Sequence, residues 1–321
     1  MSGYSSLLKV DGLTTRFRTP QGALTAVNDV SFELQPGRIL GLVGESGSGK
    51  SVTALSLLNL VDKPGEVTSR AILFKGEPLH QASPARWSAL RGDRIALVSQ
   101  DPMMSLNPVI RIGDQLTETI RIHRRLSGAD ARRIAIDALE RVGIPAPVER
   151  MKAWPHELSG GMRQRVAIAN ALVNQPDLII ADEPTTALDV TIQAQILYEM
   201  KRLARDSGTA LIWITHDLAV VKDLADELCV MYAGRIVERG PVAELIRAPR
   251  HPYTRGLLDS LPRGRSAGGR LTPIRGAAPP LSKLPAGCAF APRCPRVVAA
   301  CAELPPLAAA GGREFRCIRP L

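Results

Sequence analysis

The sequence has no hydrophobic run long enough to cross a membrane, because none of its stretches approaches the roughly 20 apolar residues that a bilayer span requires. The first residues, MSGYSSLLKVDGL, also lack the charged and then apolar pattern of a secretion signal. We therefore expect a cytosolic protein. Docking on a membrane protein stays compatible with this expectation.

The first 240 residues also have little net charge, so the formal charge of +10 is concentrated near the end of the chain. Residues 241–321 hold thirteen Lys or Arg against four Asp or Glu, together with thirteen of the 25 prolines and four of the five cysteines. This change predicts one domain at 1–240 and an extension at 241–321. A basic extension is compatible with nucleic acid, with an anionic lipid surface, or with solvated charges alone.

Strand and helix patterns alternate along the first domain. Residues 7–17 and 24–34 predict two strands joined by a turn, and residues 38–44 predict a strand buried on both faces. Helical spacing follows at 51–61, and the alternation then continues. It predicts an α/β fold with a mainly parallel sheet. Residues 101–160 are mostly helical in pattern and predict a separate subdomain.

A glycine-rich stretch stands between the buried strand and the first helix. It matches the P-loop pattern G-x-x-x-x-G-K-[ST] with Gly44, Glu45, Ser46, Gly47, Ser48, Gly49, Lys50 and Ser51. Backbone N–H groups bind a polyphosphate closely where no Cβ intervenes, and a helix start favours anions. Lys50 is expected to reach the β- and γ-phosphates, and Ser51 to ligate Mg²⁺. A flexible surface turn is the alternative, which this strand–helix setting disfavours.

Two carboxylates end a later apolar strand, in the sequence LIIADE at residues 178–183. Asp182 is expected to hold Mg²⁺, through water. Glu183 is placed to polarise the attacking water as a general base. Two solvated acids at a strand end are the alternative. With the P-loop upstream, the pair favours ATP hydrolysis with Mg²⁺ as cofactor.

Further motifs carry a family resemblance. Residues 158–165, LSGGMRQR, resemble the LSGGQ signature of ABC-type ATPases, with Met162 in place of the commonest Gln. Gln100 in VSQDP, residues 187–189 (ALD) and His216 in WITHD resemble the other motifs of that family, in the same order. The resemblance covers nearly the whole first domain. It implies a P-loop NTPase (RecA-like) core with an antiparallel β subdomain and a helical subdomain.

The resemblance also implies how a second subunit completes the site. Ser159, Gly160 and Gly161 open a helix, and in this family that helix start contacts the γ-phosphate held by the opposite subunit. Two ATP molecules are thereby enclosed in a head-to-tail dimer. Asp189 belongs to the motif that resembles the D-loop of the family, beside the nucleotide.

Three more residues receive roles from the resemblance. His216 is expected to contact the γ-phosphate; a buried polar histidine is the alternative. Gln100 is expected to ligate Mg²⁺, to sense the phosphate and to couple the site to a membrane partner; a surface glutamine is the alternative. Phe17 is the candidate for stacking on adenine, although an ordinary core phenylalanine fits as well.

A narrower resemblance runs nearly end to end. The stretches QDPMMSLNP, LSGGMRQRVAIA, ADEPTTALDVTIQAQI and HPYTRGLLDSLP, with the Cys-bearing end, resemble the ATPase subunits of oligopeptide/dipeptide permeases, whose relatives also import nickel. This implies two permease subunits, an extracytoplasmic binding protein, a second ATPase subunit of the same or a different kind, and a peripheral position at the cytoplasmic face of the inner or plasma membrane. No nucleic acid is expected.

Four cysteines mark the extension, with the spacing C-x5-C-x6-C-x15-C: Cys288, Cys294, Cys301 and Cys317. Four thiols in a loop-rich segment of a cytosolic protein favour a metal site over disulfides. The spacing is neither a usual zinc ribbon nor a common ferredoxin pattern. The family resemblance favours a [4Fe–4S] cluster; Zn²⁺ and inert thiols are the alternatives. Cys229, in an apolar strand pattern, is expected to be a small core residue.

The sequence leaves a competing function of another class, a soluble ABC ATPase acting on DNA. Such proteins usually carry a coiled coil or a large insertion before the signature, whereas only 58 residues separate Gln100 from Ser159, without heptads. Translation-associated ABC proteins carry two nucleotide domains in one chain, and this chain has one. A transport ATPase that energises peptide uptake is therefore the favoured interpretation; the cargo itself is not encoded here.

Overall fold

The computed structural model describes residues 6–261 and 273–321, apart from 21, 102–104 and 187. Contacts between residues divide the chain into two compact units. Unit 1 consists of the described parts of Met1–Leu34, Ile39–Gln81 and Thr215–Leu321, and unit 2 of Gln35–Arg38 and Ala82–Ile214. The extension therefore belongs to the same unit as the P-loop.

An antiparallel sheet forms the first layer of unit 1. Its order is β2-β1-β5-β6, with β4 also paired to β1; the strands are β1 (Leu8–Thr19), β2 (Gly22–Leu34), β4 (Gly65–Thr68), β5 (Ala71–Phe74) and β6 (Glu77–Pro78). Apolar and polar residues alternate in β1, which buries Leu8 and Val10 on one face. The strand pair expected from the sequence is confirmed.

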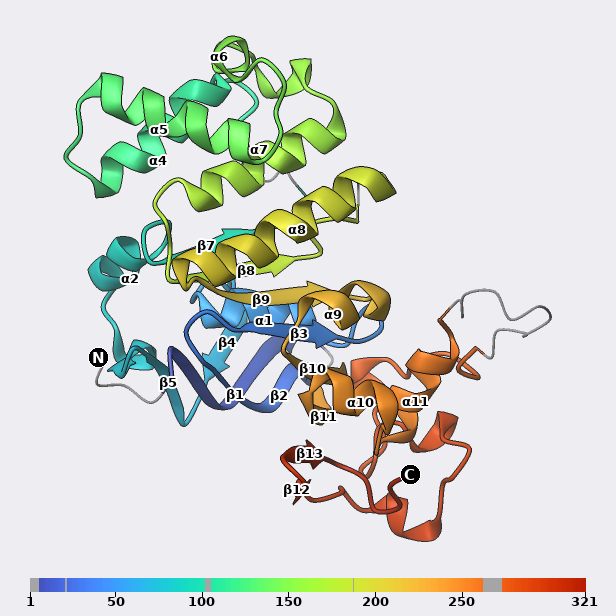
Figure 1. Ribbon diagram of the computed structural model, residues 1–321. Coiled ribbons are helices and arrows are strands. Elements are labelled where there is room, and N and C mark those ends of the chain that lie inside the picture. Colours follow the sequence, from blue (N-terminus) through green and yellow to red (C-terminus); the bar gives the residue numbers. More distant parts are fainter. Residues whose placement is uncertain (1–5, 21, 102–104, 187, 262–272) are drawn as a thin grey trace, which may run out of the picture. The chain divides into compact units, whose positions relative to one another are not determined.

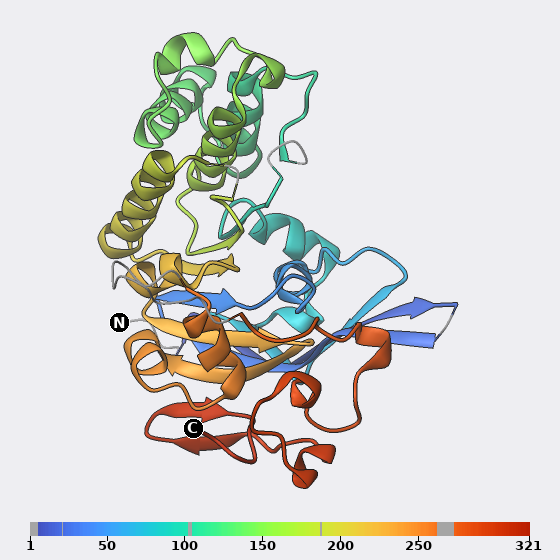
Figure 2. The ribbon, with the colours of Figure 1, turned by 90° about the vertical axis from the view of Figure 1, so that its right-hand side faces the viewer.

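A second set of strands carries the P-loop and the end of the chain. Along it run β12 (Ala308–Ala310), β13 (Arg313–Phe315), β11 (Arg235–Pro241), β10 (Glu227–Tyr232) and β3 (Ile39–Val43). Only the β3–β10 pairing is parallel among these, and all five residues of β3 are buried, as a strand covered on both faces requires. Figure 2 shows the dark-red end of the chain beside the orange β10–β11 hairpin.

Short helices complete unit 1. They are α1 (Lys50–Leu57), η1 (Leu79–Gln81), α9 (Leu218–Leu224), α10 (Val242–Arg247), α11 (Pro252–Asp259), η3 (Leu281–Lys283), η4 (Ala291–Arg293) and η5 (Ala299–Ala302). After α11, the described part of the extension has only the single turns η3, η4 and η5, the short strands β12 and β13, and loops. Side-chain contacts and the pairing of β13 with β11 therefore hold this part to the rest of unit 1.

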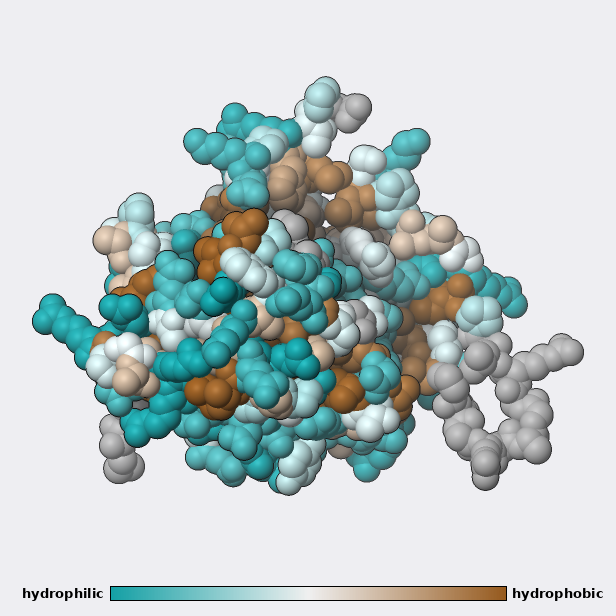
Figure 3. Space-filling view, turned by 90° about the horizontal axis from the view of Figure 1, so that it is seen from above, coloured by the Kyte–Doolittle hydropathy of each residue, from teal (hydrophilic) through white to brown (hydrophobic). Residues whose placement is uncertain are grey.

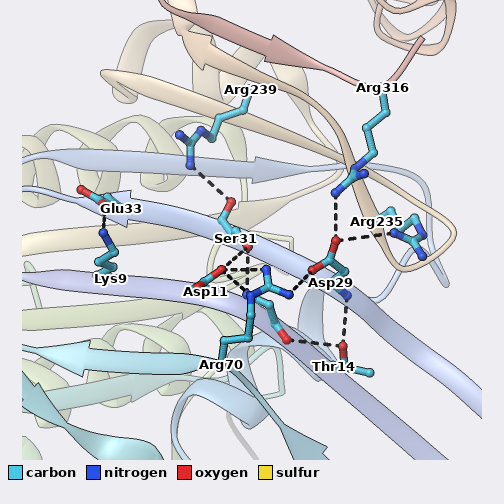
Figure 4. A network of polar contacts seen from close by, with 11 residues as sticks. Lys9, Asp11, Thr14, Asp29, Ser31, Glu33, Arg70, Arg235, Arg239 and Arg316 are labelled. Atoms are coloured by element: carbon cyan, nitrogen blue, oxygen red, sulfur yellow. Dashed lines mark hydrogen bonds and ion pairs between the residues drawn. The ribbon is translucent and has the colours of Figure 1, made fainter. Parts of the chain in front are cut away.

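One such contact joins the extension to β2. Asp29 accepts from Arg316 at 3.1 Å and from Arg70 at 3.0 Å, and Arg235 lies 3.9 Å away (Figure 4). Arg70 also donates to Asp11, and this contact holds the pKa of the Asp11 carboxyl below its usual range. Arg239 links the same surface to the extension through Glu314, at 3.1 Å. The β-sheet and the end of the chain are thus held together by a charged network.

Unit 2 combines three parallel strands with a group of helices. The strands β7 (Ile95–Val98), β8 (Leu178–Asp182) and β9 (Ala210–Thr215) pair in that order. The helices are α2 (Pro84–Leu90), α4 (Ile112–His123), α5 (Gly128–Arg141), α6 (Pro147–Arg150), η2 (Pro155–Glu157), α7 (Gly160–Leu172) and α8 (Val190–Ser207). Helices α4, α5 and α7 lie side by side (Figure 1). The helices expected between β7 and α7 are thus present.

The helix ends in unit 2 follow from local chemistry. Ser127 accepts the N–H of Asp130, so α5 starts at Gly128. Gly208 ends α8 with a φ of 68°, a conformation that glycine adopts without steric cost. Among the described residues, no helix combines the length and the apolar content of a membrane span. On the face seen in Figure 3, hydrophobic residues lie in separate patches among hydrophilic ones.

Candidate nucleotide-binding site

The P-loop joins β3 to α1, as the sequence predicts. The chain leaves the sheet after Val43, turns through Gly44–Gly49, and enters the helix at Lys50. Within the turn, the N–H of Ser48 donates to Glu45 O at 3.2 Å. The first N–H groups of an α-helix have no partners within the helix, so a helix start at this loop is suited to an anion.

The glycines of the loop serve two different needs. Gly49 has a φ of 101°, and a Cβ there would lie 2.4 Å from the carbonyl oxygen of Ala26. Gly47 also has a positive φ, of 76°, but no atom lies within 4 Å of its added Cβ. Backbone crowding within unit 1 therefore excludes a side chain at Gly49, whereas at Gly47 only the backbone conformation favours glycine.

Lys50 turns back over its own loop. Its side chain is largely buried, with 5% of the residue exposed, and Nζ donates to Gly44 O at 2.8 Å and to Glu45 O at 3.0 Å. Ser51 follows on the exposed side of the first helical turn. A buried ammonium and a helix start concentrate positive potential at the loop, which a triphosphate would complement.

A cavity of about 390 Å³ opens beside the loop. Its described lining consists of Leu24, Glu45, Ser46, Gly47, Ser48, Tyr232, Ala233, Ala278, Pro279, Pro280, Leu281 and Ser282. The last five residues come from the extension, which the sequence did not link to this site. Phe17 is not among these described lining residues. It is half-buried on β1 opposite Leu24, and its ring faces Gly65.

Unit 2 supplies the carboxylates. Asp182 ends β8 and is 8% exposed. Glu183 follows with a backbone φ of 45°, which is unusual for any residue other than glycine. Its N–H donates to Ile214 O at 2.9 Å, and its Oε2 accepts from Thr186 at 3.1 Å. The left-handed backbone and the contact with Thr186 thus hold the Glu183 side chain just after the strand.

His216 directly follows a strand, Gln100 stands two residues after another, and both are exposed. Gln100 comes after β7, where Gln164 of α7 approaches Ser99 O at 3.5 Å. His216 comes after β9 and precedes α9, whose start is capped by Asp217 at 2.8 Å. The alternative of a buried polar histidine is therefore wrong.

Two N-caps mark the signature stretch and the ALD stretch. Ser159 accepts the N–H of Met162 at 3.3 Å and starts α7, where Gly160 is exposed and Gly161 is partly buried beside Leu188. Asp189 accepts the N–H of Ile192 at 3.0 Å and starts α8. The predicted helix start at Ser159–Gly161 is confirmed, and a helix start of this kind is suited to an anion.

Sequence reasoning missed two side chains that contact the P-loop. The hydroxyl of Tyr253, in the stretch HPYTRGLL, accepts the N–H of Glu45 at 2.8 Å. Arg293, in the cysteine-bearing extension, pairs with the Glu45 carboxylate. The HPY stretch was the available signal, although nothing in it shows that its tyrosine faces a loop 208 residues earlier.

The structure does not support the expected iron–sulfur cluster, nor the zinc alternative. Within the described residues, no three or more His, Cys, Asp or Glu side chains are grouped to hold a metal ion. The four cysteines of the extension are free and partly buried, and burial raises the pKa of Cys288, Cys294 and Cys317. Cys229 is fully buried in β10, as predicted.

A P-loop between a buried strand and a helix, with an acidic pair at the end of a parallel strand, defines an α/β nucleotide-binding ATPase. Residues 27–186 match the model of the ABC transporter family, and residues 237–301 match the oligopeptide/dipeptide transporter C-terminal region. A dimeric ATP-binding cassette solved in a post-hydrolysis state with ADP and Pi superposes with a TM-score of 0.67, at 25% identity over 73% of this chain and 98% of the cassette.

Relatives match almost the whole chain. A peptide import ATP-binding protein of Brucella melitensis is 50% identical over 98% of this chain and 97% of its own length. The oligopeptide transport ATP-binding protein OppD of Salmonella typhimurium is 47% identical over 98% of this chain and 94% of its own. The chain belongs to the ABC transporter family, as an ATP-hydrolysing subunit of the oligopeptide/dipeptide transporter type.

Proposed function

We propose that this chain hydrolyses ATP while bound to partner permease subunits and thereby energises the import of peptides. The relatives named for peptide import, matched nearly end to end, support the cargo class. The observation that carries the proposal is a P-loop and an oligopeptide-type C-terminal region within one compact unit. No described feature favours the DNA-directed alternative.

The chemistry assigned to each residue follows from its group. Lys50 places a buried ammonium at the phosphate loop, and its charge would stabilise the β- and γ-phosphates. Ser51, Asp182 and Gln100 offer the oxygen ligands that Mg²⁺ prefers, so they fit a magnesium ion. Bound there, Mg²⁺ would neutralise charge on the phosphates.

Water activation falls to Glu183, which would accept a proton from the attacking water. The exposed His216 would contact the γ-phosphate. Phe17 remains our candidate for stacking on adenine; its place on β1 opposite Leu24, a residue that lines the cavity, supports this.

A second ATPase subunit, identical or related, would complete the site. The exposed helix start at Ser159–Gly161 would contact the γ-phosphate of the partner's nucleotide, with Asp189 beside it. Closure on ATP and reopening after hydrolysis would then drive two permease subunits, supplied by an extracytoplasmic binding protein. The chain would then lie at the cytoplasmic face of the membrane. We keep residues 1–240, with a helical subdomain at 101–160, as the nucleotide-binding domain and 241–321 as its extension.

The cysteines of the extension remain candidates for a [4Fe–4S] cluster or Zn²⁺. Backbone amides support this: the N–H of Arg296 lies 3.4 Å from Cys294 Sγ, and similar bonds from Phe290 and Arg319 offset part of the rise that burial causes in the pKa of Cys288 and Cys317. Such N–H···S bonds stabilise thiolates. Anaerobic purification should give a coloured protein that loses its visible absorbance in Cys294→Ser. A colourless protein with stoichiometric zinc would exclude the cluster.

Uptake of labelled peptide tests the proposed function. The chain is reconstituted in vesicles with its permease subunits, its partner ATPase and the binding protein, and uptake is followed with and without ATP. Uptake that requires ATP and is lost in Lys50→Ala supports the proposal. Nickel uptake without peptide uptake, under the same conditions, would reject the peptide cargo while retaining the ATPase.

A further inference from the structure

Glu45 is held at every polar group it has. Its N–H donates to the hydroxyl of Tyr253 at 2.8 Å. Its carbonyl accepts from Lys50 Nζ at 3.0 Å and from the N–H of Ser48 at 3.2 Å. Its carboxylate pairs with Arg293. The two groups that grip Glu45 from outside the loop both come from the region after residue 241.

Arg293 forms a two-pronged ion pair. Its Nη1 lies 2.6 Å from Glu45 Oε2 and its Nη2 lies 3.0 Å from Oε1, which is the parallel geometry that guanidinium and carboxylate prefer. The arginine side chain is only 5% exposed. Its guanidinium also faces the rings of Tyr232 and Phe290, at 5.9 and 6.0 Å. The Glu45 side chain is 30% exposed, so the arginine is the shielded partner, and removing one member of such a pair costs more than breaking an exposed pair.

The same guanidinium fixes the segment that borders the cavity. Arg293 donates to Arg275 O at 3.0 Å and to Gly276 O at 3.2 Å. Residues 278–282, two positions further on, line the cavity beside the P-loop. One side chain thus holds both the phosphate loop and a wall of the adjoining cavity.

Tyr253 is equally well placed to hold the loop. His251 caps α11 by accepting the N–H of Tyr253 at 3.0 Å, and Pro252 occupies the first helical position, where its missing N–H has no cost. Tyr253 is fully buried, and its ring lies 4.6 Å from that of Tyr232. Burial raises the pKa of its hydroxyl, which therefore stays neutral and able to accept from Glu45.

Glu45 transmits these contacts to the phosphate-binding groups. Its carbonyl is the shared acceptor for Lys50 and for the Ser48 amide, so a rotation of the Glu45–Ser46 peptide would displace both. Tyr253 holds the preceding Gly44–Glu45 peptide, whose carbonyl also accepts from Lys50, and Arg293 holds the Glu45 side chain between the two peptides. Both contacts therefore resist a movement of this part of the loop. Neither residue needs to touch the nucleotide to influence how tightly it binds.

We propose that Tyr253 and Arg293 are positioning residues of the nucleotide site, through which the cysteine-bearing extension controls ATP affinity. This rests on the proposed ATP-binding function of the P-loop. It goes beyond that function because it makes the extension a working part of the site. The two residues preorganise Lys50 and the Ser48 amide for the phosphates.

The experiment measures MgATP binding and steady-state hydrolysis by the full chain for Arg293→Ala, Arg293→Lys and Tyr253→Phe. We expect Arg293→Ala to raise the Kd and the KM for ATP by about tenfold, the scale of a lost charge-assisted bidentate bond, with kcat little changed. Arg293→Lys, which keeps charge but not the fork, should fall between. Tyr253→Phe should raise Kd by several-fold while the ring packing is kept.

Arg255→Ala is the matched control, since Arg255 makes a half-exposed ion pair with Asp259 on α11 and should bind ATP as the parent does. Melting temperatures and circular dichroism identify any variant that fails to fold, and Tyr253→Phe and Arg293→Lys then carry the test. A double cycle with Glu45→Gln should show that the effects of Glu45 and Arg293 are not additive.

The outcomes separate the two proposals. Unchanged ATP affinity in folded Arg293→Ala and Tyr253→Phe, beside a loss of binding in Lys50→Ala, would overturn the positioning role alone. If these variants lowered both kcat and the melting temperature without changing the Kd for ATP, the extension would have only a structural role, and the positioning role would again be overturned. Retained ATP binding in Lys50→Ala would instead overturn the proposed function itself.

Discussion

The α-carbon of Gly44 faces the backbone of Met231 so closely that an added Cβ would lie 2.2 Å from the Met231 carbonyl oxygen. The same added atom would lie 2.8 Å from Ser48 Oγ. The first glycine of the P-loop is thus required by its contact with β10 within unit 1. A glycine-rich loop is usually explained by the approach of phosphate, and here the fold itself adds a second requirement.

Gly44→Ala should therefore destabilise the protein, because a contact with rigid backbone cannot be relieved by a rotamer change. We expect a loss of about 2–4 kcal/mol in the free energy of unfolding, the scale of an overpacked core site. Gly47→Ala should cost only about 1 kcal/mol, from its positive φ alone. Denaturant unfolding of both variants checks the contrast; equal losses would contradict it.

Glu183→Gln should bind ATP with an affinity close to that of the parent but should lose turnover by about 100-fold or more, because the amide cannot accept the proton from water. ATP should then hold the chain in a stable dimer with its partner subunit. Steady-state phosphate release and size-exclusion chromatography with ATP measure the two effects. Undiminished turnover would remove Glu183 as the base.

Ser159→Ala should weaken ATP-dependent dimerisation. The substitution removes the cap that accepts the Met162 N–H, which costs about 1 kcal/mol at the start of α7. ATP binding to a single subunit should not change, because the proposed contact is with the partner's nucleotide. Dimer formation is compared in the Glu183→Gln background, and Ser127→Ala, which removes the cap of α5, is the control. Equal dimerisation by both variants would reject the proposed contact.

His251 predicts a pH dependence of stability. Burial lowers the pKa of its imidazole to about 4. As the pH falls from about 6.5 to about 4, the unfolded chain binds a proton that the folded chain does not, so the free energy of unfolding should fall, by up to about 3 kcal/mol. Burial raises the pKa of the nearby Glu238. The contribution of Glu238 to the free energy of unfolding therefore rises as the pH falls, opposite to that of His251.

A comparison of the parent with His251→Asn measures how much His251 contributes to the pH dependence of the free energy of unfolding, since asparagine can cap α11 without titrating. Unfolding in denaturant at pH values between 4 and 7 should show a shallower loss in the variant. Parallel pH profiles for the two proteins would show that His251 does not titrate on unfolding.

Local signals carried the prediction of the P-loop. A buried strand, a glycine-rich turn and an amphipathic helix adjoin in the sequence between Ile39 and Leu57, and each is recognisable by its own pattern. The helix start at Ser159 was predicted together with the family motif, and the one at Asp189 was not predicted, although in both a cap and the N–H it accepts are only three residues apart.

The contacts of the extension could not be predicted in this way. Arg293 and Glu45 are 248 residues apart, and an ion pair between distant residues leaves no periodicity in the sequence. Such long-range contacts hold the single turns of the extension. Its composition therefore indicated a basic, proline-rich segment but did not indicate that this segment contacts the P-loop. The cysteine spacing likewise suggested a metal site that the described side chains do not form.

Titration of the purified chain with MgATP, followed by calorimetry, tests the central claim most directly. The parent should bind one nucleotide per chain, and Lys50→Ala, which removes the buried ammonium at Gly44 and Glu45, should lose most of that affinity while remaining folded. Equal binding by the two proteins, or no binding by the parent, would contradict the account.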